Sequence, residues 1–306
     1  MIIIGVDGVI LKSYQLEDLA FQYCESLVKS NYENFFIGTL FLPRKTIKHF
    51  HSIYAYCRMI DDLGDEFSGD SNNYLNYAEE QLNLCYQGKP DSLLFHALYK
   101  TICEFSIPIQ PFLDLIEANR MDQNINRYNT FSDLLIYCEK SANPVGQLVL
   151  YLLGFTEDKC IELSNLTCTG LQLANFWQDV EEDYILRDRI YIPIEDMENF
   201  EYNEKQLWSR EYNQNFINMM EFQINRTLEY FSKGIKLLDH ISGSSKIEIA
   251  MFNLGGLGIL EKIKKRKYNV FLGRPKLTRI DKAVLLLKSI LISSRLGYKL
   301  FGHIRH

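Results

Sequence analysis

Apolar residues recur at helical spacing along almost the whole 306-residue chain. Apolar side chains three and four positions apart share one face of an α-helix, whereas a half-buried strand alternates apolar and polar residues. Strand-like alternation is nearly absent, and the seven prolines fall where helices should begin or end. The pattern predicts an all-α fold, with helices near 15–31, 43–67, 72–87, 91–105, 109–122, 130–153, 155–186, 204–239, 246–268 and 278–301.

No Gly/Ser-rich linker, repeat or low-complexity tract interrupts this pattern, and residues 1–306 are therefore predicted to form a single domain. A chain that is 47% apolar and 13% aromatic can bury a large core. The first ten residues, MIIIGVDGVI, lie outside the helical pattern. Since they lack a basic region and a small-residue cleavage site, we interpret residues 1–12 as a leader and not as a signal peptide.

The charge of the chain is polarised. Its net charge of −6 argues against a general nucleic-acid binder, which would carry a basic domain. From residue 262 onward, however, 13 Lys and Arg accompany one acid, Asp281. This end is interpreted as a solvated basic face, a phosphate-binding surface or a surface attracted to anionic lipid. The amphipathic stretch 283–300 fits either a peripheral membrane contact or a helix packed on the core.

Seven cysteines are scattered without a C-x-x-C spacing. Their odd number and the absence of a signal peptide predict buried free thiols in a reducing compartment. No apolar run approaches the roughly 18 residues of a membrane span. We therefore expect a cytoplasmic protein, with peripheral contact at the inner face of the membrane as an open alternative.

Two acid clusters lie within apolar helical sequence: SIYAYCRMIDDLGDE at 52–66 and QLANFWQDVEEDY at 172–184. Carboxylates beside large apolar residues are costly to desolvate unless a cation, a proton or a partner stabilises them. Because residues four positions apart share a helix face, Asp61 and Asp65 form one line of oxygen ligands, and Asn175, Asp179 and Asp183 form a second.

These two acid lines predict a site for a hard cation. Carboxylate and amide oxygens without paired His or Cys suit Mg²⁺ or Mn²⁺, and Mg²⁺ commonly shares phosphate oxygens, which points to a diphosphate ligand. The alternative is two ordinary exposed acidic faces. That alternative is favoured for the acids off the lines, which are Asp62, Glu66, Glu181 and Glu182.

Several motifs together resemble the squalene/phytoene synthase family of isoprenoid synthases. They are YAYCRMIDDLGDE, the N-x-x-x-D-x-x-x-D of NFWQDVEED, RIYIP at 189–193 and YCEKSANPVGQLVL at 137–150. The resemblance covers roughly residues 30–280. It implies an all-α isoprenoid synthase fold in which the acid lines face each other across the mouth of a central apolar cavity. There a Mg²⁺ cluster would bind and ionise a prenyl or presqualene diphosphate.

The resemblance also implies a role for individual residues. The metal ligands would be Asp61, Asp65, Asn175, Asp179 and Asp183, and catalysis would also involve Arg58 and Tyr137. The candidate substrate-binding residues are Asn34, Phe35, Tyr54, Ala142, Val145, Gly146, Gln172, Trp177, Gln178, Tyr268 and Arg274. Aromatic faces can stabilise a carbocation, with Tyr54, Tyr137, Phe176 and Trp177 as candidates, although aromatics at helical spacing are more often plain core.

Two departures from the family pattern concern phosphate-binding cations. NYENFF at 31–36 stands where squalene and phytoene synthases usually carry a Ser-Lys-Ser-Phe-like segment, and Trp177-Gln178-Asp179 stands where Leu-Arg-Asp is usual. Fewer cations favour an enzyme that receives one preformed diphosphate. YENF near the start, YAYCR…DDLGDE, SANPVG and ANFWQDV together most resemble the bacterial hydroxysqualene synthase branch, whose members convert presqualene diphosphate and water to hydroxysqualene and diphosphate on the route to hopanoids. No NADPH is expected, and Gln178 and Asn34 are candidates for orienting the water.

Other interpretations stay open at this stage. A complete squalene or phytoene synthase would condense two prenyl diphosphates, whereas the hydroxysqualene reading implies functional coupling to a separate presqualene diphosphate synthase. An all-α diphosphate hydrolase could use the same acids but has no use for a long apolar cavity. A noncatalytic lipid-binding or assembly relative would be expected to have lost the metal-binding aspartates, and here all four are present.

Overall fold

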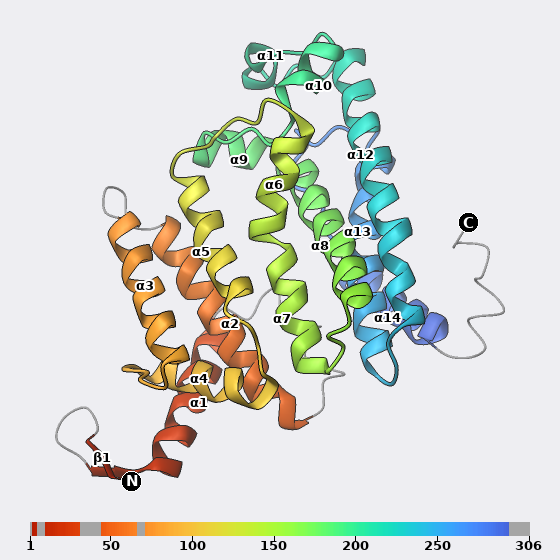
Figure 1. Ribbon diagram of the computed structural model, residues 1–306. Helices are drawn as coiled ribbons and strands as arrows, with labels where there is room; N and C mark the ends of the chain where they lie inside the picture. Colours follow the sequence, from red (N-terminus) through yellow and green to blue (C-terminus); the bar gives the residue numbers. More distant parts are fainter. Residues whose placement is uncertain (1, 5–9, 31–43, 66–70, 294–306) are drawn as a thin grey trace. The chain divides into compact units, whose positions relative to one another are not determined.

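The computed structural model describes residues 2–4, 10–30, 44–65 and 71–293, and these residues are mainly helical, as predicted (Figure 1). The strands β1 (Ile2–Ile4) and β2 (Ile10–Lys12) pair antiparallel, with Ile3 opposite Leu11. The pairing of β1 with β2 within the leader was not predicted from the sequence. The isoleucines of both strands are β-branched and favour extended backbone.

The remaining elements follow in chain order. They are α1 (Ser13–Ser30), α2 (Arg44–Asp65), α3 (Ser71–Tyr86), α4 (Leu93–Phe105), α5 (Gln110–Asp122), α6 (Phe131–Ser141), α7 (Asn143–Leu153), α8 (Asp158–Gln178), α9 (Val180–Arg187), α10 (Ile194–Asn199), α11 (Glu204–Trp208), α12 (Gln214–Gly234), the 3-10 helix η3 (Ile235–Asp239), α13 (Ser245–Lys265) and α14 (Arg279–Ser293).

The chain divides into two compact units, of which the first comprises residues 1–123 and 147–156. In this unit α2 packs against α1, α3, α4 and α5. Its core includes Tyr56, which is fully buried and donates its hydroxyl to the carbonyl of Phe112 at 3.0 Å. The buried face of α2 thereby fixes which residues of that helix face outward.

The second unit comprises residues 124–146 and 157–306, and α8 is its central helix. α8 packs against α6, α12, α13 and η3, and α14 packs against α13. Trp177 on α8 is completely buried, and its indole nitrogen donates to Thr227 Oγ1 on α12 at 2.7 Å. The division into two units does not test whether the chain forms a single domain, and the single domain stays a prediction.

Three long predicted helices are interrupted. The helix predicted over 130–153 is α6 and α7, which break at Ala142, because Pro144 has no N–H to donate to the carbonyl four residues earlier and its ring clashes with that carbonyl. The helix predicted over 155–186 breaks at Asp179, whose ψ of 15° leaves the helical range. The helix predicted over 204–239 is α11, α12 and η3, and α10 was missed.

The cysteines and the C-terminal helix agree with the sequence-based predictions in most respects. All seven cysteines are free, as predicted, but Cys103 is exposed instead of buried. The helix predicted over 278–301 is confirmed as far as Ser293, and its remainder lies outside the described residues. Among the described residues, no helix combines the length and the apolar character needed to cross a membrane.

Candidate functional site

The first acid line lies on the outward face of α2. Ile53, Tyr56 and Ile60 are buried, which turns Tyr54, Arg58 and Asp61 away from the core. Asp61 is exposed and Tyr54 is half-buried. Arg58 forms an ion pair with Asp62, one turn away, and burial raises the pKa of Tyr54. The predicted placement of Tyr54, Arg58 and Asp61 on one helix is confirmed.

The end of α2, between the two acids of the first line, is held by α5. A Cβ atom on Gly64 would lie 3.0 Å from Asn119 Cγ, and only glycine therefore fits this approach. Gln123 donates its side-chain amide to the Gly64 carbonyl at 2.9 Å, which satisfies a carbonyl at the helix end. Asp65 is the last residue of α2, and its side chain lies outside the described part of the structure.

The second acid line spans the junction of α8 and α9. The break at Asp179 preserves the four-residue spacing, since Asp179 N donates to Asn175 O at 3.0 Å and Asp183 N to Asp179 O at 2.8 Å. Asn175 is exposed, whereas Asp179 and Asp183 are buried. The backbone thus presents the three predicted oxygen donors on consecutive turns.

Each buried carboxylate of this line is paired with an arginine. Arg274 donates to both oxygens of Asp179, with Nη2 to Oδ2 at 2.8 Å, and its Nη2 lies 3.4 Å from Asn175 Oδ1. Arg187 donates to Asp183 Oδ1 at 3.0 Å. Burial, and next the negative charge of Asp179, raise the pKa of Asp183 to about 6, although Arg187 opposes the shift. The charged form of Asp183 is thus disfavoured by its surroundings, and Arg187 offsets this only in part.

The segment between α13 and α14 carries Arg274 to the second acid line. The amide nitrogen of Gln178, which is buried at the end of α8, donates to the Pro275 carbonyl. Tyr212 donates to the Lys267 carbonyl at 2.7 Å. Gln178 was a candidate for orienting water, but its nitrogen is used to hold the segment that bears Arg274.

An aromatic cluster adjoins the second acid line within the same unit. Phe176 stacks on Tyr191 with ring centroids 3.8 Å apart, and Tyr137 lies 6.1 Å from Phe176 and 5.8 Å from Tyr191. Tyr128 also stacks on Tyr191, with ring centroids 5.8 Å apart. A small cavity is lined by Phe176, Tyr191 and Asp183, among others.

Sequence reasoning named Tyr137 and Phe176 but missed Tyr128 and Tyr191. The signal was available for Tyr191, which is the central residue of the RIYIP motif. Ile190 N donates to the Asn126 carbonyl at 2.9 Å, and this pairing of two distant segments brings Tyr128 and Tyr191 together.

The other residues assigned to the cavity wall have varied surroundings. A Cβ on Gly146 would lie 2.6 Å from Ser164 Oγ, which means that a side chain at this position would displace Ser164. Trp177 lies in the packing of α8 on α12, as its bond to Thr227 shows. Tyr268 donates to Glu221 Oε1 at 2.9 Å and is not hydrogen-bonded to the acid line. Ala142, Val145 and Gln172 are half-buried.

The donor set of the second acid line fits a hard divalent cation. Asn175, Asp179 and Asp183 offer side-chain oxygen atoms, and the pKa of Asp183 is raised first by burial and next by the neighbouring charge of Asp179. Within the described ranges, no group of three or more His, Cys, Asp or Glu is suited to hold a metal, and a complete site would draw on Asn175 or on other donors.

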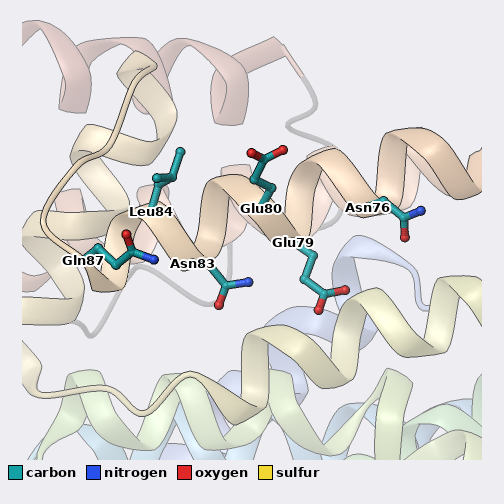
Figure 2. Close-up of a pocket in the computed structure, with 6 residues that line it drawn as sticks. All are labelled: Asn76, Glu79, Glu80, Asn83, Leu84 and Gln87. Carbon is teal, nitrogen blue, oxygen red and sulfur yellow. The ribbon is translucent and has the colours of Figure 1, made fainter.

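Some predicted site residues remain outside this description. Asn34 and Phe35 fall in 31–43, which the structure does not describe. The first acid line lies in one unit and the second in the other, and their approach across a shared apolar cavity stays a prediction. A separate hollow is lined by five residues of α3, including Glu79 and Asn83, and by Gln87 directly after that helix, and it contains none of the predicted site residues (Figure 2).

Comparisons with known proteins agree with the motifs. The sequence profile described as squalene/phytoene synthase matches residues 28–281. The 15-cis-phytoene synthase of Synechococcus elongatus is 30% identical over 267 residues, covering 82% of this chain and 86% of that protein.

Two solved structures resemble the chain over most of its length. The squalene synthase HpnC from Alicyclobacillus acidocaldarius is 39% identical with a TM-score of 0.81, covering 84% of this chain and 97% of that one. A dehydrosqualene synthase in complex with ligand is 26% identical with a TM-score of 0.83, covering 91% of this chain and 98% of that one.

Proposed function

Since the chain belongs to the squalene/phytoene synthase family, we propose that it is a hydroxysqualene synthase, which converts presqualene diphosphate and water to hydroxysqualene and diphosphate. The family and the all-α isoprenoid synthase fold are established by the profile match and the likeness to HpnC. The choice of reaction within the family is the proposal.

The observation that carries the proposal is the hydrogen bond from the Gln178 side chain to the Pro275 carbonyl. This neutral residue stands where the family usually has a cation, and its amide nitrogen is committed to the buried Pro275 carbonyl. An enzyme that condenses two prenyl diphosphates must hold two highly charged groups, whereas an enzyme that receives one preformed diphosphate needs fewer cations. A C30 product, as opposed to the C40 product of a phytoene synthase, is supported by the higher identity to the squalene synthase HpnC, 39%, than to the phytoene synthase, 30%.

The residues of the second unit have distinct tasks in this reaction. Asn175, Asp179 and Asp183, with Asp61 and Asp65 from the first acid line, would hold Mg²⁺. The metal would supply positive charge to the departing diphosphate. Arg274 and Arg187, which already lie at the carboxylates, would bind the diphosphate oxygens.

The apolar residues control water. Breaking the bond between carbon and the diphosphate oxygen leaves a C30 carbocation, and bulk water would capture it before it rearranged. The buried rings of Phe176, Tyr191 and Tyr137 would exclude water from this part of the site and would stabilise positive charge beside the cluster. One water oxygen then bonds to the rearranged cation and loses a proton, which gives the alcohol. No reductant enters this balance.

A second candidate is a complete phytoene or squalene synthase. The observation that favours it is the 30% identity to 15-cis-phytoene synthase over 82% of the chain. Such an enzyme would join two prenyl diphosphates and would have to recruit the missing cations from parts of the chain other than Gln178.

The test is to incubate the purified chain and Mg²⁺ with presqualene diphosphate, and separately with farnesyl or geranylgeranyl diphosphate, without NADPH. Mass spectrometry of the extracted lipids identifies the product. We expect hydroxysqualene from presqualene diphosphate only. A C30 or C40 product from a prenyl diphosphate alone would instead establish the complete synthase, and turnover of none of the substrates would refute both candidates.

Matched variants connect the product to the acid line. Asp183→Asn should abolish product formation, because Asp183 is a buried member of the line. Glu182→Gln removes the same charge from the neighbouring position, and Glu182 is exposed and off the line. It should retain activity. Equal losses in the two variants would show that the overall acidity of α9 matters and not the line.

A further inference from the structure

Helix α14 has two different faces, and its inner face packs on α13 (Figure 1). Lys262 on α13 forms an ion pair with Asp281 at 2.7 Å. A Cβ on Gly258 would lie 3.6 Å from Leu285 Cδ1, and Ser289 is fully buried. The four-residue spacing of Asp281, Leu285 and Ser289 defines the face that is already occupied by protein.

The opposite face of α14 is apolar and exposed. It consists of Ile280, Val284, Leu287, Ile290 and Leu291, and we call these five residues the outer face. Ile280 is 77% exposed and Leu287 63% exposed. Surface helices normally turn polar side chains to water, and a continuous exposed apolar patch marks an interaction surface. The face needs a partner that accepts apolar side chains.

Charge complementarity identifies the kind of partner. Lys276, Arg279, Lys282 and Lys288, on α14 and just before it, are exposed, and the one acid of α14, Asp281, is already paired with Lys262. From residue 262 onward the chain carries 13 cations and one acid, which leaves a net charge of −18 for the rest of the chain. An anionic surface would therefore attract this end and repel the remainder.

We propose that the outer face of α14 docks on the surface of an anionic lipid bilayer. A helix with an apolar face and flanking Lys and Arg lies in the interface, its apolar side chains among the acyl chains and its cations among the head groups. A second copy docked through the same face would instead bring two sets of these four cations together. The contact is peripheral, as none of the described helices could span the bilayer.

The consequence for catalysis rests on the proposed function. α14 begins five residues after Arg274, which binds the second acid line. Docking α14 therefore holds this half of the site close to the membrane, where an apolar C30 diphosphate and its alcohol product would reside.

The experiment is co-sedimentation of the full chain with vesicles of phosphatidylcholine, with and without phosphatidylglycerol, at low and high salt. It measures binding without turnover, and a failure of the proposed reaction would not affect it. We expect binding to the anionic vesicles only, weakened by salt because the charges at the surface are screened.

Two pairs of variants test the face and the charges separately. Leu287→Glu should weaken binding at least tenfold, whereas Leu19→Glu, at an exposed position on α1, should leave it unchanged. Lys282→Glu with Lys288→Glu should also weaken binding about tenfold or more. Lys205→Glu with Lys236→Glu gives the same net charge at exposed positions elsewhere and should bind like the wild type.

Three results would overturn the proposal. The first is no sedimentation of the wild type with anionic vesicles, as expected if another part of the chain covered the outer face. The second is equal weakening by both lysine pairs. The third is a wild-type oligomer in light scattering that Leu287→Glu converts to a monomer, which would make a second copy the occupant. Because these positions are exposed, thermal unfolding of the variants should match that of the wild type.

Discussion

The carboxyl group of Glu248 is placed where it should control stability in the neutral pH range. Glu248 lies on α13 with 1% of its surface exposed, and neither carboxylate oxygen has a hydrogen-bond partner among the described residues. Burial raises the pKa of this group from 4.5 to about 8. Near pH 7 the folded chain therefore holds a neutral Glu248, whereas the unfolded chain ionises it.

The size of the effect follows from these two pKa values. Because the pKa of Glu248 is higher in the folded state, its contribution to the free energy of unfolding is fully present below the unfolded value of 4.5. That contribution is lost as the pH rises to about 8. Each pH unit in this window costs about 1.4 kcal/mol. The free energy of unfolding should thus fall by roughly 2 to 3 kcal/mol between about pH 5 and pH 7 through Glu248 alone.

Glu248→Gln removes this titration. The free energy of unfolding of the wild type and the variant is measured by urea denaturation across that pH range. The difference between the two should change by the amount above, since other titrating groups, including Asp183, are common to both proteins. Burying an amide in place of the carboxyl group shifts the free energy of unfolding of the variant by an amount that does not depend on pH. The informative quantity is therefore the change of the difference with pH.

An exposed residue of the same unit provides the control. Glu229→Gln on α12 makes the same substitution at an exposed position and controls for effects of the exchange that do not depend on burial. If the Glu248→Gln difference were no more dependent on pH than the Glu229→Gln difference, the reasoning from burial would be refuted.

Three further substitutions test the packing and the site. Gly146→Ala should lower the free energy of unfolding by about 1 to 3 kcal/mol, because the new Cβ would meet Ser164 Oγ at 2.6 Å; an unchanged melting temperature would contradict this. Gln178→Leu should cost about 1 to 3 kcal/mol in urea unfolding, as it leaves the buried Pro275 carbonyl without its donor; equal stability would show that the bond is dispensable. Arg274→Gln should reduce turnover of presqualene diphosphate roughly 100-fold and should also lower the melting temperature, because it leaves the buried Asp179 carboxylate without its cation; full activity would remove Arg274 from the site.

The sequence predicted the helical class because periodicity reports which faces are buried, but it could not locate the helix breaks. Asp179 keeps the four-residue spacing of the acid line through a change of ψ that leaves the sequence pattern intact. The break before Pro144 was readable from the proline itself. The paired strands of the leader were missed because three-residue segments carry too little periodicity for a pattern to be recognised.

Long-range contacts explain what the sequence missed in the site. Tyr191 and Tyr128 are brought together by backbone pairing between segments more than 60 residues apart, which no local pattern encodes. Glu248 sits within an apolar helical stretch, where a lone acid is normally assigned to a solvated face. Its burial is decided by the helices packed around α13, and these became known only with the fold.

The pairing of Arg274 with Asp179 affects how many cations are free to bind a diphosphate. From the sequence, cations that the family usually carries are missing near the second acid line. In the structure, Arg187 and Arg274 donate hydrogen bonds to the carboxylates of that line. These arginines can turn to a diphosphate only when another cation takes over the carboxylates, because otherwise two buried negative charges would be left uncompensated. Binding of a divalent cation to Asp179 and Asp183 and binding of a diphosphate to the arginines should therefore favour each other. With Gln178 neutral and tied to Pro275, this exchange provides for one diphosphate group at the second acid line, which is the number that a preformed presqualene diphosphate requires.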